Sequence, residues 1–335
     1  MCQFYSNPKV SIVVPIYNVG LYIGKCAESL FRQTYDNIEY VFVDDCTPDN
    51  SIIVLKKILG LFPQRKTQTR IICHDSNKGL SCARETGIQN STGDFIIHVD
   101  GDDFVDEEMV ELCIRKALQD FSDIVIFGTK QEYKDKSCDD YRACEELSIE
   151  SYLSQMIQQN IPSNIWGKMY KLSLYKDNDI HCIPHIGYGE DFAVLPKLLG
   201  KAKKVSFLKK TLYHYVHYNT MSFTNSFKWK NLNELMIVES ELRGYFRNNP
   251  KISCDLDISH LKWTAWALRN VCVAGLNMGD ALKMLNYPKV NVLDLKGFSV
   301  NHKIILFCYK MKWFRLLVIY VKVSKSIFGG LVRKK

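Results

Sequence analysis

The stretch Ile96-Ile97-His98-Val99-Asp100-Gly101-Asp102-Asp103 joins a short apolar run to three carboxylates. An apolar run of this length, preceded by Gly93-Asp94, predicts a buried central strand. Neighbouring carboxylates make one another harder to ionise unless a cation lies close by. The end of this strand therefore suits a divalent metal with oxygen ligands, and such a metal often carries substrate phosphates. The alternative is that Asp102, Asp103 and Asp106 cap the helix that follows.

Apolar segments on both sides of this stretch predict strands that alternate with helices. We expect strands at about 10–16, 38–43, 70–73, 95–99 and 123–127, with helices at about 19–33, 49–61, 81–89 and 107–118. This alternation predicts an open, mostly parallel Rossmann-like α/β sheet, in which ligands bind beyond the carboxyl ends of the strands. Gly-x-Gly-x-x-Gly and P-loop motifs are absent, which argues against a dinucleotide oxidoreductase or a P-loop enzyme.

The 335-residue chain has the composition of an ordered globular protein, with 47% hydrophobic and 24% charged residues. We expect no secretory signal, and no run reaches the ~20 apolar residues that span a bilayer. The 12 cysteines lack the spacing of a metal site. This favours a reduced, cytoplasmic setting. There, cysteines such as Cys26, Cys73, Cys82 and Cys113 would pack as small apolar side chains.

Four motifs occur in order over the first ~105 residues, and together they are far more specific than any one alone. They are Val-Ser-Ile-Val-Val-Pro-Ile-Tyr-Asn (10–18), Val-Asp-Asp-x-x-x-Asp-Asn-Ser (43–51), Asn-x-Gly-x-x-x-Ala-Arg (77–84) and Val-Asp-Gly-Asp-Asp (99–103). In this combination the chain resembles the family 2 glycosyltransferases, which have the GT-A fold and invert the anomeric carbon. It departs from the family at Cys46-Thr47-Pro48, where Gly-Ser-Thr is usual, and at Glu85, where Asn is usual.

The resemblance implies a UDP-sugar donor and a site at the carboxyl edge of the sheet. Asp44 would bind uracil, Arg84 would lie near the diphosphate, Asp100 would touch the ribose or the metal's waters, and Asp102 would ligate Mg²⁺ or Mn²⁺. The same motifs place these residues around the donor: Pro15, Tyr17, Asn18, Asp45, Asn77 and Gly79. Without the motifs, Asp44 and Asp45 are turn residues at a strand end, and Arg84 lies on a solvated helix face.

The second half carries weaker motifs. Trp166-Gly167-Lys168 within 165–170 and Gly189-Glu190-Asp191 resemble the family's Trp-x-Lys-x-Tyr and Glu-Asp elements, which makes Asp191 the general base and Glu190, Trp166 and Lys168 possible site residues. A sugar hydroxyl needs such a base because it is a poor nucleophile until its proton is removed. Alternatively, Glu190 and Asp191 only begin a helix.

An aromatic segment follows at Tyr213-His214-Tyr215, with Met221-Ser222 further on. His214 or His217 could approach the phosphates, but a packed or surface histidine is the alternative. We expect a nucleotide-sugar domain at 1–128, an acceptor subdomain at 129–224 that begins with a polar, irregular connection at 129–147, and a helical region at 225–335.

The end of the chain is basic. Residues 301–335 contain nine Lys or Arg and no Asp or Glu, which accounts for the net charge of +8 and argues against a body that binds nucleic acid. An apolar stripe recurs at helical spacing, with basic residues such as Lys303, Lys310, Arg315, Lys322 and Lys325 largely opposite. The stripe is Ile305, Tyr309, Trp313, Leu316, Tyr320, Val323 and Ile327. It predicts either peripheral contact of 303–335 with an anionic membrane, or packing against the body.

The sequence therefore predicts a metal-dependent, inverting glycosyltransferase that moves a sugar from a UDP-sugar to a glycan or lipid-linked acceptor in bacterial surface-polysaccharide assembly. We expect it in the cytoplasm, at the inner face of the membrane if the tail binds lipid. Two alternatives remain open: a sugar-phosphate nucleotidyltransferase, and a non-catalytic protein that binds nucleotide sugars or glycans. The absence of a glycine-rich triphosphate loop disfavours the first, and the presence of a base at Asp191 disfavours the second.

Overall fold

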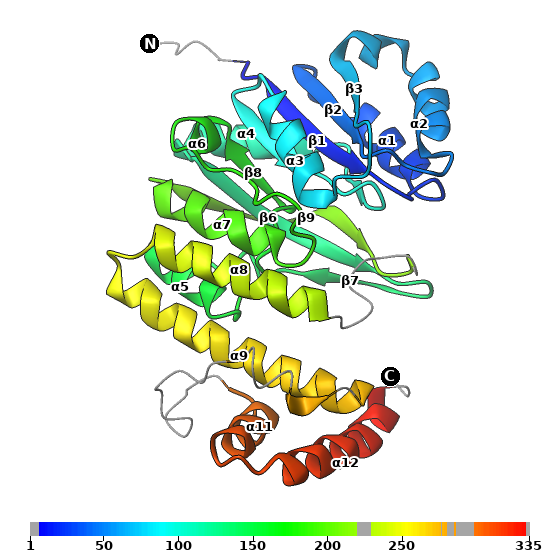
Figure 1. The fold of residues 1–335 in the computed structure, drawn as a ribbon. Helices are drawn as coiled ribbons and strands as arrows, with labels where there is room; N and C mark the ends of the chain where they lie inside the picture. The colour runs from blue at the N-terminus through cyan, green and yellow to red at the C-terminus, as the bar shows by residue number, and fades with distance from the viewer. Residues whose placement is uncertain (1–6, 220–228, 276, 280–284, 286–297, 333–335) are drawn as a thin grey trace. The chain divides into compact units, whose positions relative to one another are not determined.

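The computed structural model describes residues 7–219, 229–275, 277–279, 285 and 298–332; the side chains of Ala274 and of 324–332 lie outside the description. The chain divides into two compact units, one of residues 1–153 and 161–226, the other of residues 154–160 and 227–335 (Figure 1). The first unit holds the sheet and the second is helical. The expected division of the chain into functional parts at 1–128, 129–224 and 225–335 stays a prediction.

The N-terminal half of the sheet is parallel. Strands β1 (Val10–Ile16), β2 (Ile38–Asp44), β3 (Thr69–Cys73) and β4 (Phe95–His98) lie in the order β3-β2-β1-β4. All seven residues of β1 are buried, as expected for a parallel strand covered on both faces. The connecting helices are α1 (Ile23–Phe31), α2 (Ser51–Gly60) and α3 (Leu80–Gln89), with the 3₁₀ helix η1 (Pro63–Gln68) after α2.

Helices α1 and α3 cover opposite faces of β1. Ile12 and Val14 share a core cluster with α1, whereas the intervening Val13 points toward α3. At Gly87 of α3 a Cβ atom would lie 2.2 Å from Val13 Cγ1. Only glycine therefore lets the helix lie this close to the strand, and Arg84, one turn earlier on α3, is held just above the carboxyl ends of the strands.

The C-terminal half of the sheet is mixed. Strand β8 (Lys168–Lys171) pairs antiparallel with β4 and with β6 (Ile124–Glu132), and β6 lies parallel to β9 (Val205–Val216), which pairs with β5 (Phe104–Val105). The helices of this part are α4 (Met109–Asp120), α5 (Ile149–Ile157), α6 (Ser173–Lys176) and α7 (Glu190–Lys201).

The irregular connection expected over 129–147 was wrong in its first part. Strand β6 continues to Glu132 and forms a hairpin with β7 (Ser137–Asp140). The first three residues of β7 are exposed. Because both faces of this strand are polar, it lacks the apolar alternation by which strands are recognised in a sequence.

The helical unit contains α8 (Trp229–Tyr245), α9 (Pro250–Ala274), α11 (Val300–Lys310) and α12 (Phe314–Val332). Asn249 caps α9 by accepting a hydrogen bond from the Ile252 N–H, and Pro250 occupies the first helical position. Ser299 caps α11 in the same way through the His302 N–H. In the described part of the chain, the helices include none with the length and apolarity needed to cross a membrane.

The continuous apolar stripe expected over 305–327 is broken. Lys312 adopts φ +58°, and the helix stops at Lys310 and resumes at Phe314. Ile305 and Tyr309 are buried in the core of the helical unit, whereas Trp313, Leu316 and Val323 are 46%, 52% and 51% exposed. The side chains of Lys325 and Ile327 lie outside the description. Some residues of the stripe therefore pack inside the helical unit, and others are exposed.

The cysteines in the described residues are all free thiols. Cys26 and Cys113 are buried as expected, but Cys73 is exposed at the end of β3 and Cys82 is half-buried. The expectation of a packing role was therefore wrong for Cys73, which is the last residue of β3, the edge strand of the sheet.

Candidate active site

Polar residues gather at the carboxyl edge of the parallel strands. Asp44 ends β2 and Asp45 follows it, the 74–79 loop follows β3, and Asp100 and Asp102 follow β4. Tyr17, just beyond β1, is 45% exposed. Pro15 is buried near the end of β1, where it pairs with Val43 of β2. The predicted polar edge is therefore present, and its residues differ in how exposed they are to a ligand.

Asp45 holds two loops together. It is 2% exposed, its Oδ1 lies 2.7 Å from His74 Nδ1 and accepts from the Lys78 N–H, and its Oδ2 accepts from the Gly79 N–H, both at 2.8 Å. Asn77 adds a 3.4 Å bond to the Asp45 carbonyl. Gly79 begins α3 with φ +90°, which glycine adopts without strain. These contacts occupy both carboxylate oxygens of Asp45, so in this structure it shapes the loop.

Asp44 and Asn18 frame the turn that departs from the family pattern. Asp44 Oδ1 accepts from the Thr47 N–H at 2.9 Å, and the Asn18 N–H donates to Thr47 Oγ1 at 2.9 Å. Between them Cys46 has φ +55°. The backbone therefore keeps the left-handed conformation that suits glycine, although cysteine occupies the position.

Replacing Cys46 by glycine should raise the free energy of unfolding by about 0.5–1 kcal/mol. The left-handed conformation costs a residue with a Cβ atom about 1–2 kcal/mol, part of which glycine loses again through the greater freedom of its unfolded chain. Urea unfolding measures the change. Cys138→Gly is the control, because Cys138 is exposed in the extended strand β7 and its replacement should destabilise. Destabilisation of both variants alike would contradict the prediction.

The strongest feature of the edge is a cluster of three carboxylates around one guanidinium. Arg84 Nη2 lies 2.9 Å from Asp100 Oδ1, and Arg84 Nη1 lies 3.1 Å from Glu190 Oε1 and also pairs with Asp191 Oδ1. The Arg84 side chain is only 2% exposed, so the alternative that it lies on a solvated helix face is wrong. Its Nε is buried without a partner in the described residues. Arg84 therefore binds the proposed base directly, a contact that the sequence did not predict.

Asp191 is held by a second contact. Its Oδ2 accepts a 3.0 Å hydrogen bond from the Ile165 N–H, while its side chain stays 16% exposed. Each carboxylate oxygen has two lone pairs, so both contacts leave acceptor capacity. Asp191 also lies in the first turn of α7, as the alternative interpretation expected. The N-cap residue of this helix is Gly189, however, and no side chain caps the helix. Asp191 thus has a fixed orientation and remains open to a ligand.

Burial and mutual repulsion change the ionisation of this cluster. Burial, and then the Asp191 carboxylate, raise the pKa of Glu190 to about 8. Burial also raises the pKa of Asp191, and Arg84 opposes that rise. Burial works against the charge of Arg84, but the surrounding carboxylates outweigh it and raise the Arg84 pKa. A carboxylate whose pKa has risen toward neutrality is better matched to accepting a proton from a hydroxyl group.

The other two carboxylates of the acidic stretch have different partners. Asp103 is buried, with Oδ2 accepting from Tyr213 Oη at 2.6 Å and Oδ1 accepting from the Val216 N–H at 2.8 Å, so it ties β9 to the end of β4. Asp102 Oδ2 accepts from Asn219 Nδ2 at 2.8 Å. Helix α4 has no side-chain N-cap. The capping role considered for Asp102, Asp103 and Asp106 is therefore wrong.

Asp102 suits a hard divalent cation, but it would supply only one of the ligands that such a cation needs. Burial, and then the neighbouring Asp100, raise the pKa of Asp102, so a cation beside it would relieve an unfavourable charge. Among the described residues, however, no three His, Cys, Asp or Glu side chains form a metal-binding group. Mg²⁺ and Mn²⁺ are commonly held by one or two carboxylates together with substrate phosphates and water. The donor set here suits that arrangement and not a complete protein cage.

The remaining predicted residues, Lys168 and Trp166, lie at and just before the start of β8 in the first unit. Lys168 is buried, and its Nζ donates to the carbonyls of Asn164 at 2.6 Å and Trp166 at 3.4 Å, while burial lowers the Lys168 pKa to about 8. The Trp166 ring stacks on Tyr213 at 4.9 Å. Lys168 thus shapes the loop that also carries the Ile165 N–H to Asp191.

His214 is a packed histidine in this structure. Its Nδ1 lies 2.7 Å from Glu132 and its Nε2 lies 2.9 Å from Asp106, and the ring stacks on Phe104. Both ring nitrogens are therefore engaged by carboxylates. His217 pairs instead with Gln131 at 2.7 Å. Met221 and Ser222 lie outside the described residues.

Sequence reasoning missed two residues that complete the acidic stretch. Tyr213 accepts a hydrogen bond from the Asp100 N–H at 3.1 Å and donates to Asp103, and Asn219 contacts Asp102. The aromatic run at 213–215 offered a signal for Tyr213. Nothing in the sequence distinguished Asn219, because a single amide side chain after a strand forms no pattern.

Comparison with known proteins identifies the family of this chain. The family model described as glycosyl transferase family 2 matches residues 11–183. The chain belongs to that family. Glycosyltransferase GlyA of Streptococcus pneumoniae is 30% identical over 241 residues, which cover 67% of this chain and 33% of that protein. The uncharacterized glycosyltransferase EpsJ of Bacillus subtilis is 32% identical over 214 residues, or 62% of this chain and 61% of EpsJ.

Solved structures confirm the fold class of this family 2 glycosyltransferase. The structure of S. aureus TarS 1-349 in complex with UDP-GlcNAc superposes with a TM-score of 0.72 over 95% of this chain and 91% of that one, at 18% identity. The mannosyltransferase PcManGT of Pyrobaculum calidifontis, in complex with GDP-Man and Mn²⁺, gives a TM-score of 0.52 at 14% identity. The predicted sheet followed by a helical C-terminal region is thus confirmed, and these likenesses speak to fold alone.

Proposed function

We propose that this family 2 glycosyltransferase moves a sugar from a UDP-sugar to a hydroxyl group of a saccharide or lipid-linked saccharide, with inversion, during assembly of a bacterial surface polysaccharide. The Arg84 cluster is the observation that carries the proposal, since it holds a base on α7 against a carboxylate at the end of β4. The TarS complexes with UDP-GlcNAc and UDP support a uridine donor, and the glycosyltransferase relatives support the setting.

In this mechanism Asp191 takes the proton from the attacking hydroxyl as the new glycosidic bond forms. The Ile165 N–H fixes the direction of the carboxylate, and Arg84 keeps it from being protonated too readily. Attack on the side of the anomeric carbon opposite the leaving UDP inverts its configuration, so a single base suffices. Glu190, whose pKa is raised to about 8, keeps a proton near neutral pH and so limits repulsion beside Asp191.

The donor would lie along the edge formed by Tyr17, Asp44 and Asp100. The Asp44 carboxylate can accept from the imide N–H of uracil, which selects bases that carry this donor. Asp102 would hold Mg²⁺ or Mn²⁺, with Asp100 beside it; when bound, the cation offsets the negative charge that grows on the departing diphosphate. Of these carboxylates, Asp100 is held in place by its ion pair with Arg84.

A UDP-release assay tests the proposal through Asp102. The full chain is incubated with UDP-sugars, Mn²⁺ and saccharide acceptors, and we expect acceptor-dependent release of UDP. Asp102→Asn should lower the rate at least about 100-fold, because a metal-bound transition state is stabilised by several kcal/mol. Asp36→Asn is the control, since its side chain is 97% exposed and it precedes β2, away from the carboxyl edge.

The same assay separates the alternatives. Formation of pyrophosphate from a nucleoside triphosphate and a sugar phosphate would favour a nucleotidyltransferase. Binding of UDP-sugars without turnover under any acceptor would favour a binding protein. Either result contradicts the proposal, as would an unchanged rate in Asp102→Asn.

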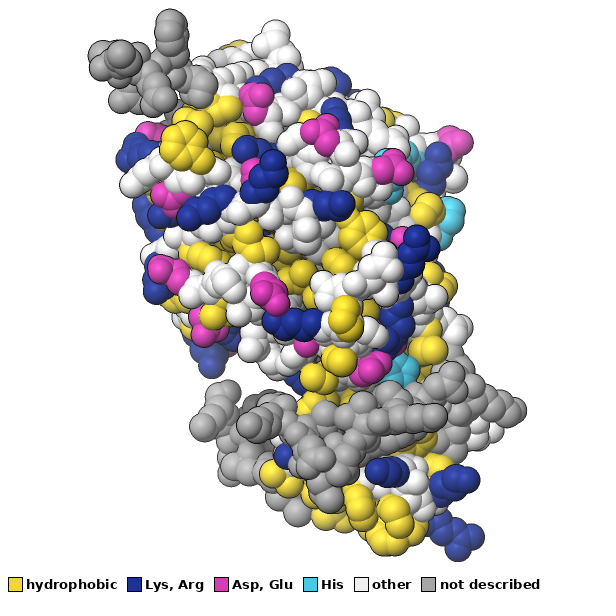
Figure 2. Space-filling model, turned by 90° about the vertical axis from the view of Figure 1, so that its left-hand side faces the viewer, with side chains coloured by type: hydrophobic (Ala, Val, Ile, Leu, Met, Phe, Trp, Pro, Cys, Tyr) yellow, Lys and Arg dark blue, Asp and Glu magenta, His cyan; other side chains and the backbone are white. Residues whose placement is uncertain are grey.

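We further propose that α11 and α12 contact the inner face of an anionic membrane. The exposed apolar side chains of these helices and of the turn between them include Phe307, Met311, Trp313, Leu316, Ile319 and Val323, which are between 39% and 58% exposed. Lys310, Lys312, Arg315 and Lys322 are exposed beside them, and 301–335 contains no acidic residue. Figure 2 shows apolar and basic side chains together on this part of the molecule. Apolar anchors flanked by basic residues match the chemistry of an anionic lipid surface.

Vesicle sedimentation checks the membrane contact. The full chain should sediment with phosphatidylglycerol-containing vesicles and much less with phosphatidylcholine alone. A Leu316→Ser/Ile319→Ser variant should lose about 10-fold or more in affinity, because two half-exposed apolar side chains no longer enter the lipid. Leu21→Ser, at a residue 92% exposed in the other unit, is the matched control. Equal sedimentation of both variants would end the idea.

A further inference from the structure

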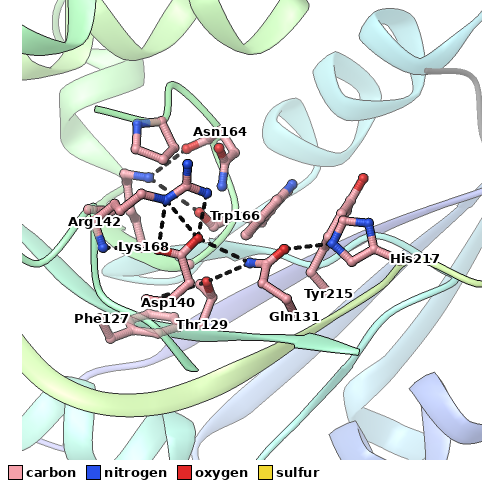
Figure 3. A pocket seen from close by; sticks show the side chains of 13 residues that line it. Phe127, Thr129, Gln131, Asp140, Arg142, Asn164, Trp166, Lys168, Tyr215 and His217 are labelled. Atoms are coloured by element: carbon pink, nitrogen blue, oxygen red, sulfur yellow. Dashed lines mark hydrogen bonds and ion pairs between the residues drawn. The ribbon is translucent and has the colours of Figure 1, made fainter. Parts of the chain in front are cut away.

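A cavity of the sheet unit lies where β6, β7 and β9 meet the 162–168 loop. Its volume is about 280 Å³. Figure 3 shows side chains from these four segments turned toward one space. The segments are far apart in the sequence, and the cavity exists because the β6–β7 hairpin extends beyond the end of β8. This hairpin is the part of the sheet that sequence patterns did not predict.

One wall of the cavity is aromatic. The Trp166 ring stacks on Tyr215, with ring centres 4.9 Å apart and planes 12° from parallel. Tyr215 meets His217 edge to face at 4.7 Å, and His217 stacks on Tyr133 at 4.4 Å. Such flat faces pack against the apolar C–H face of a sugar ring and require no charge on the ligand. This wall therefore favours a cyclic, weakly polar ligand.

The facing wall is polar and carries donors and acceptors in a connected row. Arg142 Nη2 donates to Asp140 Oδ2 at 2.6 Å, and Gln131 Nε2 reaches the same oxygen at 3.4 Å. Gln131 Oε1 lies 2.7 Å from His217 Nε2. The donors among these groups are an amide, an imidazole and a guanidinium, and the acceptors are a carboxylate and an amide oxygen. A polyhydroxylated ligand needs both kinds, because each hydroxyl group donates and accepts hydrogen bonds.

Both cations that line the cavity, Arg142 and Lys168, are already engaged by other groups of the protein. Arg142 is neutralised by Asp140, and this hydrogen-bonded pair keeps the pKa of Asp140 below its usual range. Burial lowers the pKa of His217, which favours the uncharged ring. The Lys168 ammonium is 1% exposed and already binds two backbone carbonyls. An uncharged ligand is therefore favoured over a phosphate-bearing one.

The aromatic wall and the base share one loop. Trp166 follows Ile165, whose N–H orients Asp191, and the Trp166 ring also stacks on Tyr213, whose hydroxyl donates to Asp103. A ligand packed on Trp166 thus contacts the residue next to the group that positions the base. This continuity connects the cavity to the acceptor side of the reaction.

We propose that this cavity is a subsite for an uncharged pyranose unit of the acceptor. It rests on the proposed function in one respect, the identity of the ligand as acceptor. Arg142 and His217 hydrogen-bond its hydroxyl groups, and Trp166 and Tyr215 receive its apolar face. The subsite holds the acceptor chain while the reacting hydroxyl meets Asp191.

Direct binding tests the subsite without any transfer reaction. Lactose, maltose and N,N′-diacetylchitobiose are the uncharged probes, glycerol 3-phosphate is the anionic probe, and saturation-transfer NMR of the full chain is the readout. At least one disaccharide should bind, and Arg142→Ala and His217→Ala should each weaken binding about 10-fold. Arg115→Ala is the matched control, because Arg115 is also an exposed arginine paired with an acidic residue. Unfolding midpoints confirm that each variant is folded.

Kinetics then separate this inference from the proposed function. In the UDP-release assay, both pocket variants should raise the acceptor KM about 10-fold while the KM for the UDP-sugar and the kcat at saturating acceptor stay within about 2-fold. Preferential binding of glycerol 3-phosphate, unchanged disaccharide binding in both variants, or a raised donor KM would each overturn the subsite. Disaccharide binding that the variants weaken, in a chain that transfers no sugar, would uphold the cavity as a saccharide site and refute the proposed function.

Discussion

Replacing Asp191 by asparagine is expected to lower the kcat of sugar transfer by about 10²–10⁴-fold, the usual contribution of a positioned general base. Asparagine has nearly the same shape and can still accept from the Ile165 N–H through its amide oxygen. It cannot take a proton from the acceptor hydroxyl. The loss should therefore appear in the chemical step, with the loop at 164–168 unchanged.

Kinetics and calorimetry together check the role of Asp191. The kcat is measured from UDP release at saturating donor and acceptor, and the affinity for UDP with Mn²⁺ should stay within about 3-fold of the unsubstituted chain. Glu190→Gln is the matched control, because Glu190 is the adjacent carboxylate on α7 and pairs with the same Arg84 nitrogen. A loss in Glu190→Gln as large as in Asp191→Asn would show that the cluster acts as a unit and that Asp191 has no special role.

Replacing Arg84 by methionine is expected to lower the free energy of unfolding by about 3–5 kcal/mol at pH 8. Removing one partner from a buried ionic group leaves uncompensated charge, and here three carboxylates, each 22% exposed or less, would lose their shared cation. Methionine keeps the apolar volume of the arginine stem, so the effect reports charge more than packing.

The pH dependence of that variant supplies the second readout. Without Arg84 the folded-state pKa values of Glu190 and Asp191, which burial already raises, move further above their unfolded values. The folded state then binds more protons than the unfolded state, and its stability increases as pH falls. Denaturant unfolding at pH 5 should therefore show a smaller deficit than at pH 8. Arg32→Met, at an exposed i,i+4 pair with Glu28, should change stability little at either pH. A deficit independent of pH would contradict the electrostatic account.

The sequence predicted the parallel part of the fold well, because its signals are local. Strand β1 is a continuous β-branched run that is buried on both faces, and the expected bounds of 10–16 and 38–43 differ from the observed strands by at most one residue. The β6–β7 hairpin was missed because the pairing partner of a polar strand cannot be found from its own composition.

The site was predictable as a neighbourhood but not as a set of contacts. Motif spacing placed Asp45 and Arg84 near the donor, and both are at that edge, yet Asp45 binds loop N–H groups and Arg84 binds carboxylates. A sequence shows which residue types approach one place. It does not show which carboxylate oxygen already accepts a hydrogen bond. Arg84, for example, binds Glu190 and Asp191, which lie more than 100 residues away along the chain.

The imbalance between one guanidinium and its three carboxylate neighbours has a consequence for the way the donor arrives. Near neutral pH Glu190 keeps its proton, but the carboxylates of Asp100, Asp102 and Asp191 still outnumber the one guanidinium. The rim of the sheet is therefore an electronegative well, whose field extends about 8 Å at physiological ionic strength. Under the proposed function, a nucleotide sugar without its cation is repelled by this well, so the neutralised cation complex is the form that we expect to bind. Discrimination would then begin in solution, before any contact with the pocket forms.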